Sequence, residues 1–260
     1  APPFGADDKK LLEAAHMLKG LGVDVLTFPD SPSGRTRIDS VLMAQKVKNV
    51  TGFEVMPHIC CRDKNAIAMR STFLGASIND INNFLIITGD PIPVMARQVV
   101  MSVFNFDSVG LMRIADEMNS EALKDSPLTY GGAINHSRRR IESEIKRVQK
   151  KMEAGAEFFL TQPVFTAEDA ERLRRVKEET GARILCGIMP LVSRKNALFM
   201  KNEISGVNVT DEVIERYPET ADREDGENVG VELAKEMIAI TKDFADGYYF
   251  SFPFNRTYLL

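Results

Sequence analysis

The sequence predicts a parallel α/β fold, and two patterns carry this prediction. Short runs rich in β-branched and aromatic residues alternate along the chain with segments in which apolar residues recur every three or four positions. Most of the short runs are apolar throughout, which is typical of strands in a parallel sheet that is covered by helices. The 260 residues contain no Gly/Ser linker or low-complexity tract, so we expect one domain over residues 1–260.

Seven segments are expected to form strands. No G-x-G-x-x-G motif follows the first of them and the chain has no Walker A motif, which favours a closed (β/α)8 TIM-type barrel over a doubly wound sheet. Such a barrel needs an eighth strand, and the first recognisable element after Pro2-Pro3 is a helix. We therefore expect the first strand upstream of residue 1. The seven expected strands are residues 23–28, 54–59, 83–89, 128–135, 158–165, 183–190 and 248–254.

Helices are expected between the strands. One begins near Asp8, one follows Thr166 and ends at Gly181, and others cover residues 63–74, 107–118 and 229–244. Met and Phe at helical spacing are expected in the core. The helix residues expected to be buried are Leu11, Ala15, Leu18, Leu21, Ile67, Phe73, Leu74, Met112, Ala115, Met118, Leu173, Val176, Leu233, Met237, Ile240 and Phe244.

Composition excludes several classes of function. With 33 basic and 37 acidic residues the net charge is −4, which argues against binding nucleic acid or an anionic membrane over the whole chain. No apolar run approaches the roughly 20 residues of a transmembrane helix. The three cysteines form no C-x-x-C motif, and the three histidines lack metal-ligand spacing, so we expect no metal centre. Sparse cysteines without a signal peptide predict a cytoplasmic protein.

Polar residues follow six of the seven predicted strands. In a (β/α)8 barrel the chemistry gathers at the carboxyl ends of the strands, so their convergence predicts a site there. These residues are Thr27, His58, Cys60, Thr88, Gly89, Asp90, Asn135, His136, Gln162, Asn255 and Arg256.

Asp90 is the most informative of these residues. It directly follows an apolar strand, between Gly89 and Pro91. A carboxylate held there would tune a bound heterocycle or orient a substrate amine, and the alternative is that it caps the next turn. For His58 the alternative is a hydrogen-bonded structural residue.

Residues 138–151 hold seven basic residues against two acidic ones. One interpretation is a solvated helix face. The other is that Arg147, Lys150 and Lys151 hold a diphosphate. Nucleic acid is disfavoured because no aromatic residues are interleaved with the charges.

A series of motifs along the chain carries a resemblance. In order they are residues 57–65 (PHICCRDKN), 86–91 (IITGDP), 153–157 (EAGAE), 160–165 (LTQPVF), 187–191 (GIMPL) and 254–256 (FNR). With these motifs the chain resembles the methylenetetrahydrofolate reductase family, most closely the reductase half of bifunctional bacterial proteins that fuse it to a homocysteine S-methyltransferase. The resemblance implies an eight-stranded barrel that binds FAD and belongs to one-carbon metabolism and methionine biosynthesis. It implies that hydride passes from NADH or NADPH through FAD to 5,10-methylenetetrahydrofolate, giving 5-methyltetrahydrofolate.

The resemblance also implies roles for individual residues. Asp90 and Gln162 are implied to be catalytic, and Gln162 and Arg256 to bind the folate. The general acid of the family, a glutamate, is expected upstream of Ala1 and so outside the chain. Arg194 departs from the family, in which several members have an aromatic residue over the folate. The residues implied to bind FAD are Thr27, His58, Thr88, Gly89, Asp90, Gly132, Ala133, Asn135, Glu144, Arg147, Lys150 and Lys151.

Other partners and functions stay open at this point. A homo-oligomer is expected, as is a fused or partner methyltransferase domain, and a ferredoxin or partner flavoprotein is an alternative electron donor. Two rival hypotheses are a pterin-binding methyltransferase barrel without flavin and a non-catalytic subunit that holds flavin or folate for a partner.

Overall fold

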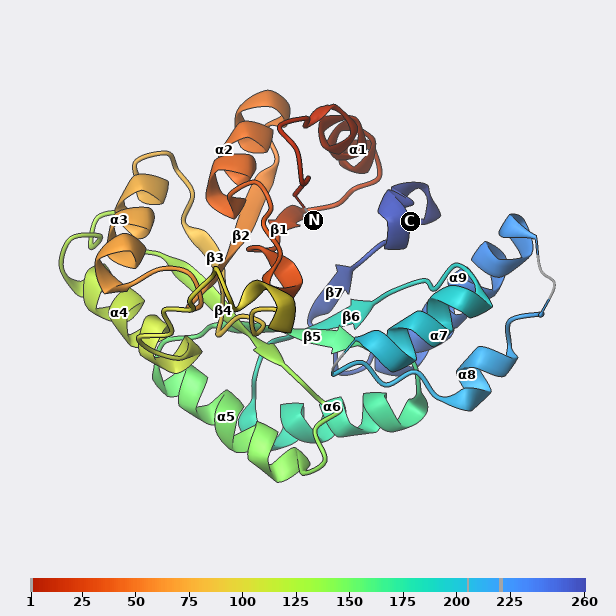
Figure 1. The fold of residues 1–260 in the computed structure, drawn as a ribbon. Helices are drawn as coiled ribbons and strands as arrows, with labels where there is room; N and C mark the ends of the chain where they lie inside the picture. The colour runs from red at the N-terminus through yellow and green to blue at the C-terminus, as the bar shows by residue number, and fades with distance from the viewer. Residues whose placement is uncertain (1, 205, 220–221) are drawn as a thin grey trace. The chain divides into compact units, whose positions relative to one another are not determined.

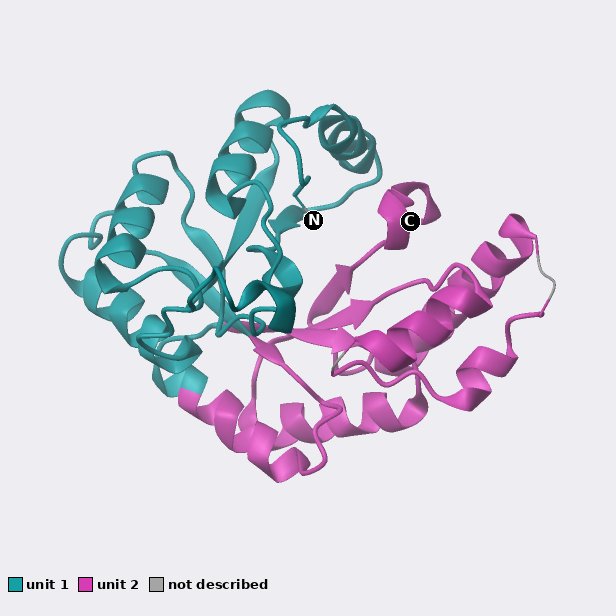
Figure 2. Cartoon of the chain, viewed as in Figure 1, with its two compact units in different colours: residues 1–132, 151–157 teal, residues 133–150, 158–260 magenta. Residues whose placement is uncertain are grey.

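A computed structural model describes residues 2–204, 206–219 and 222–260. The chain separates into two compact units (Figure 2), of which unit 1 comprises residues 1–132 and 151–157, and unit 2 comprises residues 133–150 and 158–260. Among the described residues no helix combines the length and the apolar character that crossing a membrane requires.

Unit 1 is built on parallel strands that pair in chain order. They are β1 (Val25–Phe28), β2 (Glu54–Cys60), β3 (Asn83–Ile87) and β4 (Thr129–Ile134), and β4 continues from unit 1 into unit 2. Because all pairings are parallel, the carboxyl ends of the strands lie at the same edge of the sheet. The buried side chains of β2 and β3 form the centre of this unit.

The helices of unit 1 lie along one face of its strands (Figure 1). α2 packs on β1 and β2, and α4 packs on β3. Asp39, Asn65 and Asp107 cap the helices that follow them, each by accepting a backbone N–H in the first turn. The helices are α1 (Lys9–Gly20), α2 (Ser40–Thr51), α3 (Ala66–Ser77) and α4 (Ser108–Ser120), with the short 3-10 helices η1 (Pro32–Gly34) and η2 (Val94–Ala96).

Unit 2 repeats the strand–helix alternation. Its strands β5 (Phe158–Pro163), β6 (Ile184–Ile188) and β7 (Gly247–Phe250) are parallel and pair in chain order. A capping box between Thr166 and Asp169 starts α6. The helices are α5 (Ile141–Glu153), which begins in unit 2 and ends in unit 1, α6 (Ala167–Thr180), α7 (Arg194–Glu203), α8 (Asp211–Glu215) and α9 (Arg223–Thr241), with η3 (Pro253–Asn255) and η4 (Thr257–Leu259).

All seven expected strands are present, and every pairing given above is parallel. The expected α/β fold is therefore confirmed, while a closed eight-stranded barrel stays a prediction. The expected strand 248–254 was too long, because β7 ends at Phe250 and the chain then turns through η3. The sequence patterns also missed α2 and α7.

Four expected core residues are exposed instead. Ile67 is 77% exposed, Leu21 52%, Leu74 42% and Ile240 36%, so their assignment to the core was wrong. α3 is apolar on nearly all sides, and only the face with Met69 and Phe73 is buried. A helix without a polar face gives no sequence signal for which side turns inward.

Gly155, in the EAGAE motif, is held in a conformation that excludes a side chain. Its φ is +90°, and a Cβ there would lie 2.2 Å from the Tyr130 hydroxyl oxygen. That hydroxyl donates a hydrogen bond of 2.9 Å to the Ala154 carbonyl. The turn after α5 is thus fixed against β4 by a buried tyrosine, which leaves room for glycine alone.

Gly155→Ala is expected to destabilise the protein more than Gly22→Ala. Gly22 also has a positive φ, +77°, but nothing lies within 4 Å of its Cβ position. In the control, Gly22→Ala, the free energy of unfolding should therefore fall by only about 1–2 kcal/mol, the cost of a left-handed backbone conformation for alanine. Gly155→Ala should lose about 1–3 kcal/mol more because Tyr130 must move. Denaturant unfolding of both variants measures the difference, and equal losses would show that the Tyr130 contact is not restrictive.

Candidate active site

Unit 1 gathers five of the predicted site residues at the carboxyl ends of β1, β2 and β3. In the strand register Thr27 lies opposite Met56 and His58 opposite Leu85, so both residues are near the ends of neighbouring strands. Thr88, Gly89 and Asp90 directly follow β3. Gly132 and Lys151 also belong to unit 1, in β4 and α5 respectively, and both are buried.

His58 is a buried histidine with an unpaired ring nitrogen, Nε2. Its carbonyl accepts a hydrogen bond of 2.8 Å from the Ser40 hydroxyl, but its Nε2 atom has no hydrogen-bond partner among the described residues. Burial lowers the pKa of the imidazole from 6.5 to about 3, so the ring is neutral near pH 7. A buried, unsatisfied ring nitrogen at a strand end is a ready partner for the polar edge of a heterocycle.

The Asp90 carboxylate is already oriented by backbone. Its Oδ2 atom accepts a hydrogen bond of 2.7 Å from the Ser33 amide, which lies in the turn after β1. Ser31 and Ser33 both have positive φ in that turn, 42° and 56°. Asp90 stays exposed, so a ligand can reach it.

The buried guanidinium of Arg62 ties together the loops that follow β1, β2 and β3. Arg62 donates to the Ser31 carbonyl at 3.0 Å, to the Asp90 carbonyl at 3.1 Å, and to both carboxylate oxygens of Asp63 at 2.8 and 2.6 Å. The side chain is only 2% exposed. The hydrogen bonds to Asp63 raise the pKa of Arg62 above its ordinary value, so it is fully charged.

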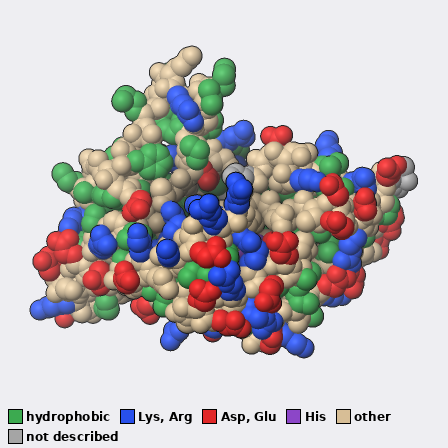
Figure 3. All heavy atoms as spheres, turned by 90° about the horizontal axis from the view of Figure 1, so that it is seen from below, with side chains coloured by type: hydrophobic (Ala, Val, Ile, Leu, Met, Phe, Trp, Pro, Cys, Tyr) green, Lys and Arg blue, Asp and Glu red, His purple; other side chains and the backbone are tan. Residues whose placement is uncertain are grey.

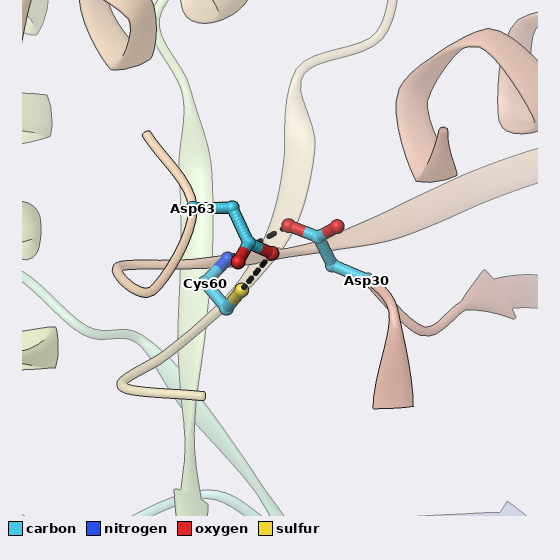
Figure 4. A group of neighbouring side chains, drawn as sticks. All are labelled: Asp30, Cys60 and Asp63. Atoms are coloured by element: carbon cyan, nitrogen blue, oxygen red, sulfur yellow. Dashed lines mark hydrogen bonds between the residues drawn. The ribbon is translucent and has the colours of Figure 1, made fainter. Parts of the chain in front are cut away.

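Asp30, Cys60 and Asp63 form a cluster beside this guanidinium (Figure 4). One ligand atom from each lies within 4.8 Å of the others, and Asp30 accepts a hydrogen bond of 3.1 Å from the Cys60 amide. Burial raises the pKa of the Cys60 thiol to about 12 and raises that of Asp30. Because Asp63 is engaged by Arg62 and the thiol is protonated, the cluster serves to hold the loops, and we do not assign it a metal.

Thr88 joins the same edge to the next helix. Its hydroxyl accepts a hydrogen bond of 3.2 Å from the amide of Ser108, the first residue of α4, and its carbonyl accepts one of 3.1 Å from Cys61. Thr88 thus fixes the end of β3 to α4 through its hydroxyl and to the residue after β2 through its carbonyl.

In unit 2 the predicted residues Asn135 and Glu144 contact each other. Glu144 is buried, and its Oε1 atom accepts a hydrogen bond of 2.9 Å from the Asn135 amide. Its Oε2 atom lies 2.8 Å from Nε of Arg138 and 3.8 Å from Nε of Arg147. Glu144 therefore anchors the end of β4 to α5 and holds two arginines at that end. Ala133, also predicted, is half-buried in β4.

The basic residues of α5 divide between surface and core. Arg147 and Lys150 are exposed, whereas Lys151 is buried. Figure 3 shows Lys and Arg side chains interspersed with Asp and Glu on the face where α5 and α6 lie, and Arg175 pairs with both Glu142 and Glu179 there. This balance of charge favours local pairing over a nucleic-acid surface.

The remaining predicted residues of unit 2 lie in different settings. Gln162 is half-buried near the end of β5. Arg256 lies beyond η3, and its guanidinium is 2.7 Å from a Glu227 oxygen on α9. Arg194 starts α7 and donates to the Ile214 and Tyr217 carbonyls at 3.2 and 3.3 Å, so its guanidinium holds the end of α8. The roles given to these residues by resemblance stay predictions.

His136 was expected at a strand end together with Asn135, and it is completely buried. Its Nε2 atom lies 3.6 Å from Oδ1 of Asp169, which caps α6. Burial lowers the pKa of His136 to about 4. A neutral ring packed under the start of α6 is a structural residue.

Sequence reasoning missed the connecting residues of the site. Arg62 and Asp63 stand inside the PHICCRDKN motif, and Asp30 follows the first strand as Asp90 follows the third. An acid directly after a predicted strand was the available signal for Asp30. Two of the partners of Arg62 are backbone carbonyls in other loops, at Ser31 and Asp90, so no residue pattern indicates them.

Comparison with known proteins places these features in a family. The family model described as methylenetetrahydrofolate reductase matches residues 1–247. The 5,10-methylenetetrahydrofolate reductase of Buchnera aphidicola subsp. Schizaphis graminum is 25% identical over 194 residues, 73% of this chain and 63% of that protein. The protein of the same name from Salmonella typhimurium is 24% identical over 174 residues, 66% of this chain and 55% of that protein. The matched region therefore spans less than two thirds of each curated relative.

Solved structures show a related fold at low identity. Two crystal forms of 2,3-dimethylmalate lyase, a member of the PEP mutase/isocitrate lyase superfamily, align with TM-scores of 0.52 and 0.51. The first alignment covers 94% of this chain and 71% of that chain at 12% identity, and the second covers 84% and 70% at 14% identity. These likenesses concern the fold alone.

We expect His58 to make the protein less stable in acid. Below the ordinary pKa of 6.5 the unfolded imidazole takes up a proton, while the folded one stays neutral down to about 3. Stability from this residue is therefore lost as the pH falls from 6.5 towards 3 and is unchanged above 7. The free energy of unfolding should fall more steeply with falling pH in wild type than in His58→Phe. The difference between the two slopes should approach about 1.4 kcal/mol per pH unit.

Unfolding in denaturant between pH 4 and 8 measures this slope. His16→Phe is the control, because His16 lies exposed on α1. Identical slopes for wild type and His58→Phe would contradict the burial of a neutral His58.

Arg62→Leu is expected to lower the free energy of unfolding by about 3 kcal/mol or more, because it removes four hydrogen bonds that a buried guanidinium makes to three loops. Arg70→Leu is the matched control. Arg70 pairs with Glu117 on the surface, where the Arg70 side chain is 37% exposed and that of Glu117 is 52% exposed. A surface pair is worth about 1 kcal/mol or less. Equal losses in the two variants, measured by urea unfolding, would show that Arg62 does not hold the loops together.

Proposed function

The chain belongs to the methylenetetrahydrofolate reductase family, and from this premise we propose that it reduces 5,10-methylenetetrahydrofolate to 5-methyltetrahydrofolate. The observation that carries the proposal is the family match over residues 1–247, together with an exposed Asp90 that a backbone amide holds at the strand ends. We further propose that the strands belong to an eight-stranded (β/α)8 barrel. The parallel pairing in chain order within each unit supports this arrangement.

FAD is the proposed cofactor, and when bound it supplies the hydride-transfer chemistry. The residues at the strand ends of unit 1 fit a flavin, since the buried Nε2 atom of His58 needs a polar partner and Gly89, just after β3, adds no side chain. In unit 2, Glu144 holds Arg138 and Arg147 at the end of β4, where cationic groups suit ribose and diphosphate. The residues proposed to hold FAD are Thr27, His58, Thr88, Gly89, Asp90, Gly132, Ala133, Asn135, Glu144, Arg147, Lys150 and Lys151.

NADH or NADPH is the proposed electron donor. In the proposed reaction the five-membered ring of the substrate opens to a cationic iminium. The Asp90 carboxylate stabilises this positive charge electrostatically, and the Ser33 amide and Arg62 hold it in place beforehand. Gln162 binds the pterin through its amide, and Arg256 contributes to folate binding. The proton donor for ring opening is not assigned to a residue of this chain.

The cofactor is expected to be FAD and not FMN, because cationic side chains on α5 suit a diphosphate, which FMN lacks. Protein purified from flavin-replete cells should be yellow, and heat should release a molecule with the mass of FAD. Release of FMN would contradict the diphosphate assignment. Colourless protein that still binds folate would favour a methyltransferase barrel without flavin, and yellow protein without turnover would favour a non-catalytic binding subunit.

Asp90→Asn is expected to slow the folate half-reaction by about 10²-fold or more, because one preorganised charge is lost while the shape is kept. Reduction of the flavin by the nicotinamide should change less, since no cationic substrate forms in that step. Stopped-flow absorbance of the flavin follows both half-reactions separately. Asp107→Asn is the control, because Asp107 caps α4 and asparagine caps equally well. Equal slowing of both half-reactions would point to a displaced flavin and contradict the charge role.

A further inference from the structure

Strand β5 contains a β-bulge at Thr161 and Gln162. Leu160 pairs with Leu185 of β6, but Pro163 pairs with Gly187. Two residues of β5 therefore stand opposite the single residue Cys186. Such a bulge changes the direction of the side chains that follow it, and bulges are frequent beside active sites.

The Thr161 hydroxyl holds the bulge closed. It accepts a hydrogen bond of 2.8 Å from the Gly187 amide and donates one of 2.7 Å to the Gln162 carbonyl. Thr161 is 5% exposed, so water does not replace these bonds. Ladder pairing resumes directly afterwards, where the Val164 amide donates 3.0 Å to the Gly187 carbonyl.

Gly187, on the neighbouring strand, is shaped to fit the bulge. A Cβ there would lie 2.8 Å from both the Thr161 and the Gln162 carbonyl oxygens. Any side chain at position 187 would push the bulged peptide away. The LTQPVF and GIMPL motifs therefore meet at one backbone contact that sets the peptide plane of Gln162.

We propose that Thr161 is a positioning residue. By holding the backbone of Gln162 it fixes the direction of the Gln162 side-chain amide, and Gly187 leaves the space that the bulge needs. This inference rests on the proposed function, in which Gln162 binds the pterin. A side-chain amide recognises a heterocycle through one donor and one acceptor at a fixed angle. If the Gln162 peptide rotates, its side chain turns with it and both hydrogen bonds to the heterocycle are lost. Loss of the Thr161 hydroxyl should then weaken folate binding and leave the flavin chemistry intact.

The test compares Thr161→Val, which keeps the shape and removes the hydroxyl, with Thr161→Ser, which keeps the hydroxyl. The flavin-loaded protein is titrated with 5-methyltetrahydrofolate, and flavin reduction by the nicotinamide is timed in parallel. Thr161→Val should raise the Kd about tenfold, as loss of one buried hydrogen bond does. Thr161→Ser should bind as wild type does, and flavin reduction should be unchanged in both.

Two further comparisons separate positioning from general stability. Thr241→Val removes another buried hydroxyl of unit 2, one that donates 2.7 Å to the Met237 carbonyl within α9, and it should leave the Kd unchanged. In a Gln162→Ala background, Thr161→Val should cause no additional weakening. If Thr161→Val does not fold, Gly187→Ala disturbs the same bulge from β6 and should show the same change in Kd.

The outcomes distinguish this inference from the function on which it rests. If Gln162→Ala weakens folate binding but neither Thr161→Val nor Gly187→Ala does, the inference is wrong and the proposed function stands. If Thr161→Val and Thr241→Val weaken binding equally, or if Thr161→Val still weakens it without Gln162, Thr161 is merely structural. If Gln162→Ala leaves binding unchanged, the proposed role of Gln162 fails, and the inference fails with it.

Discussion

The guanidinium of Arg62 donates hydrogen bonds to three loops at once, and the geometry of unit 1's strand ends depends on it. Its partners are the Ser31 carbonyl after β1, the Asp63 carboxylate after β2 and the Asp90 carbonyl after β3. A buried guanidinium must satisfy its donors, and these three groups are the acceptors that it finds. The loops therefore keep one arrangement, and that arrangement directs the Asp90 carboxylate towards the Ser33 amide.

In unit 2, too, a buried polar side chain fixes the backbone by hydrogen bonds. There the buried Thr161 hydroxyl satisfies the two backbone groups that the bulge in β5 would leave without partners. In both units a buried residue fixes the geometry of the residue that is proposed to act on the substrate. Arg62 is joined to Asp90 by a hydrogen bond, and Thr161 precedes Gln162 in the chain. Because the fixed element is backbone, the functional side chain keeps its own polar atoms for a ligand.

The sequence predicted the strands well and the strand-end contacts poorly, for physical reasons. Apolar runs such as 83–89 are buried in any parallel α/β arrangement. Such strands can therefore be predicted without knowing which elements pack against them. The exposure of Leu74 depended on which side of an apolar helix met the sheet, and the early end of β7 depended on the turn through η3. Asp90 and Gln162 were singled out as candidates because polar residues directly follow or end apolar runs. Arg62 and Thr161 were not, because they act on backbone groups of strands distant in the chain.

The central claim is that Arg62 acts through Asp90 by holding its loop in place for a cationic substrate. A double-mutant cycle of Arg62→Lys and Asp90→Asn tests it most directly, with the rate of flavin reoxidation by 5,10-methylenetetrahydrofolate as the readout. Lysine keeps the charge but cannot reach three loops together. Arg62→Lys is expected to slow this rate in the wild-type background and to have little further effect once Asp90 is asparagine. Independent, additive effects of the two changes would contradict it.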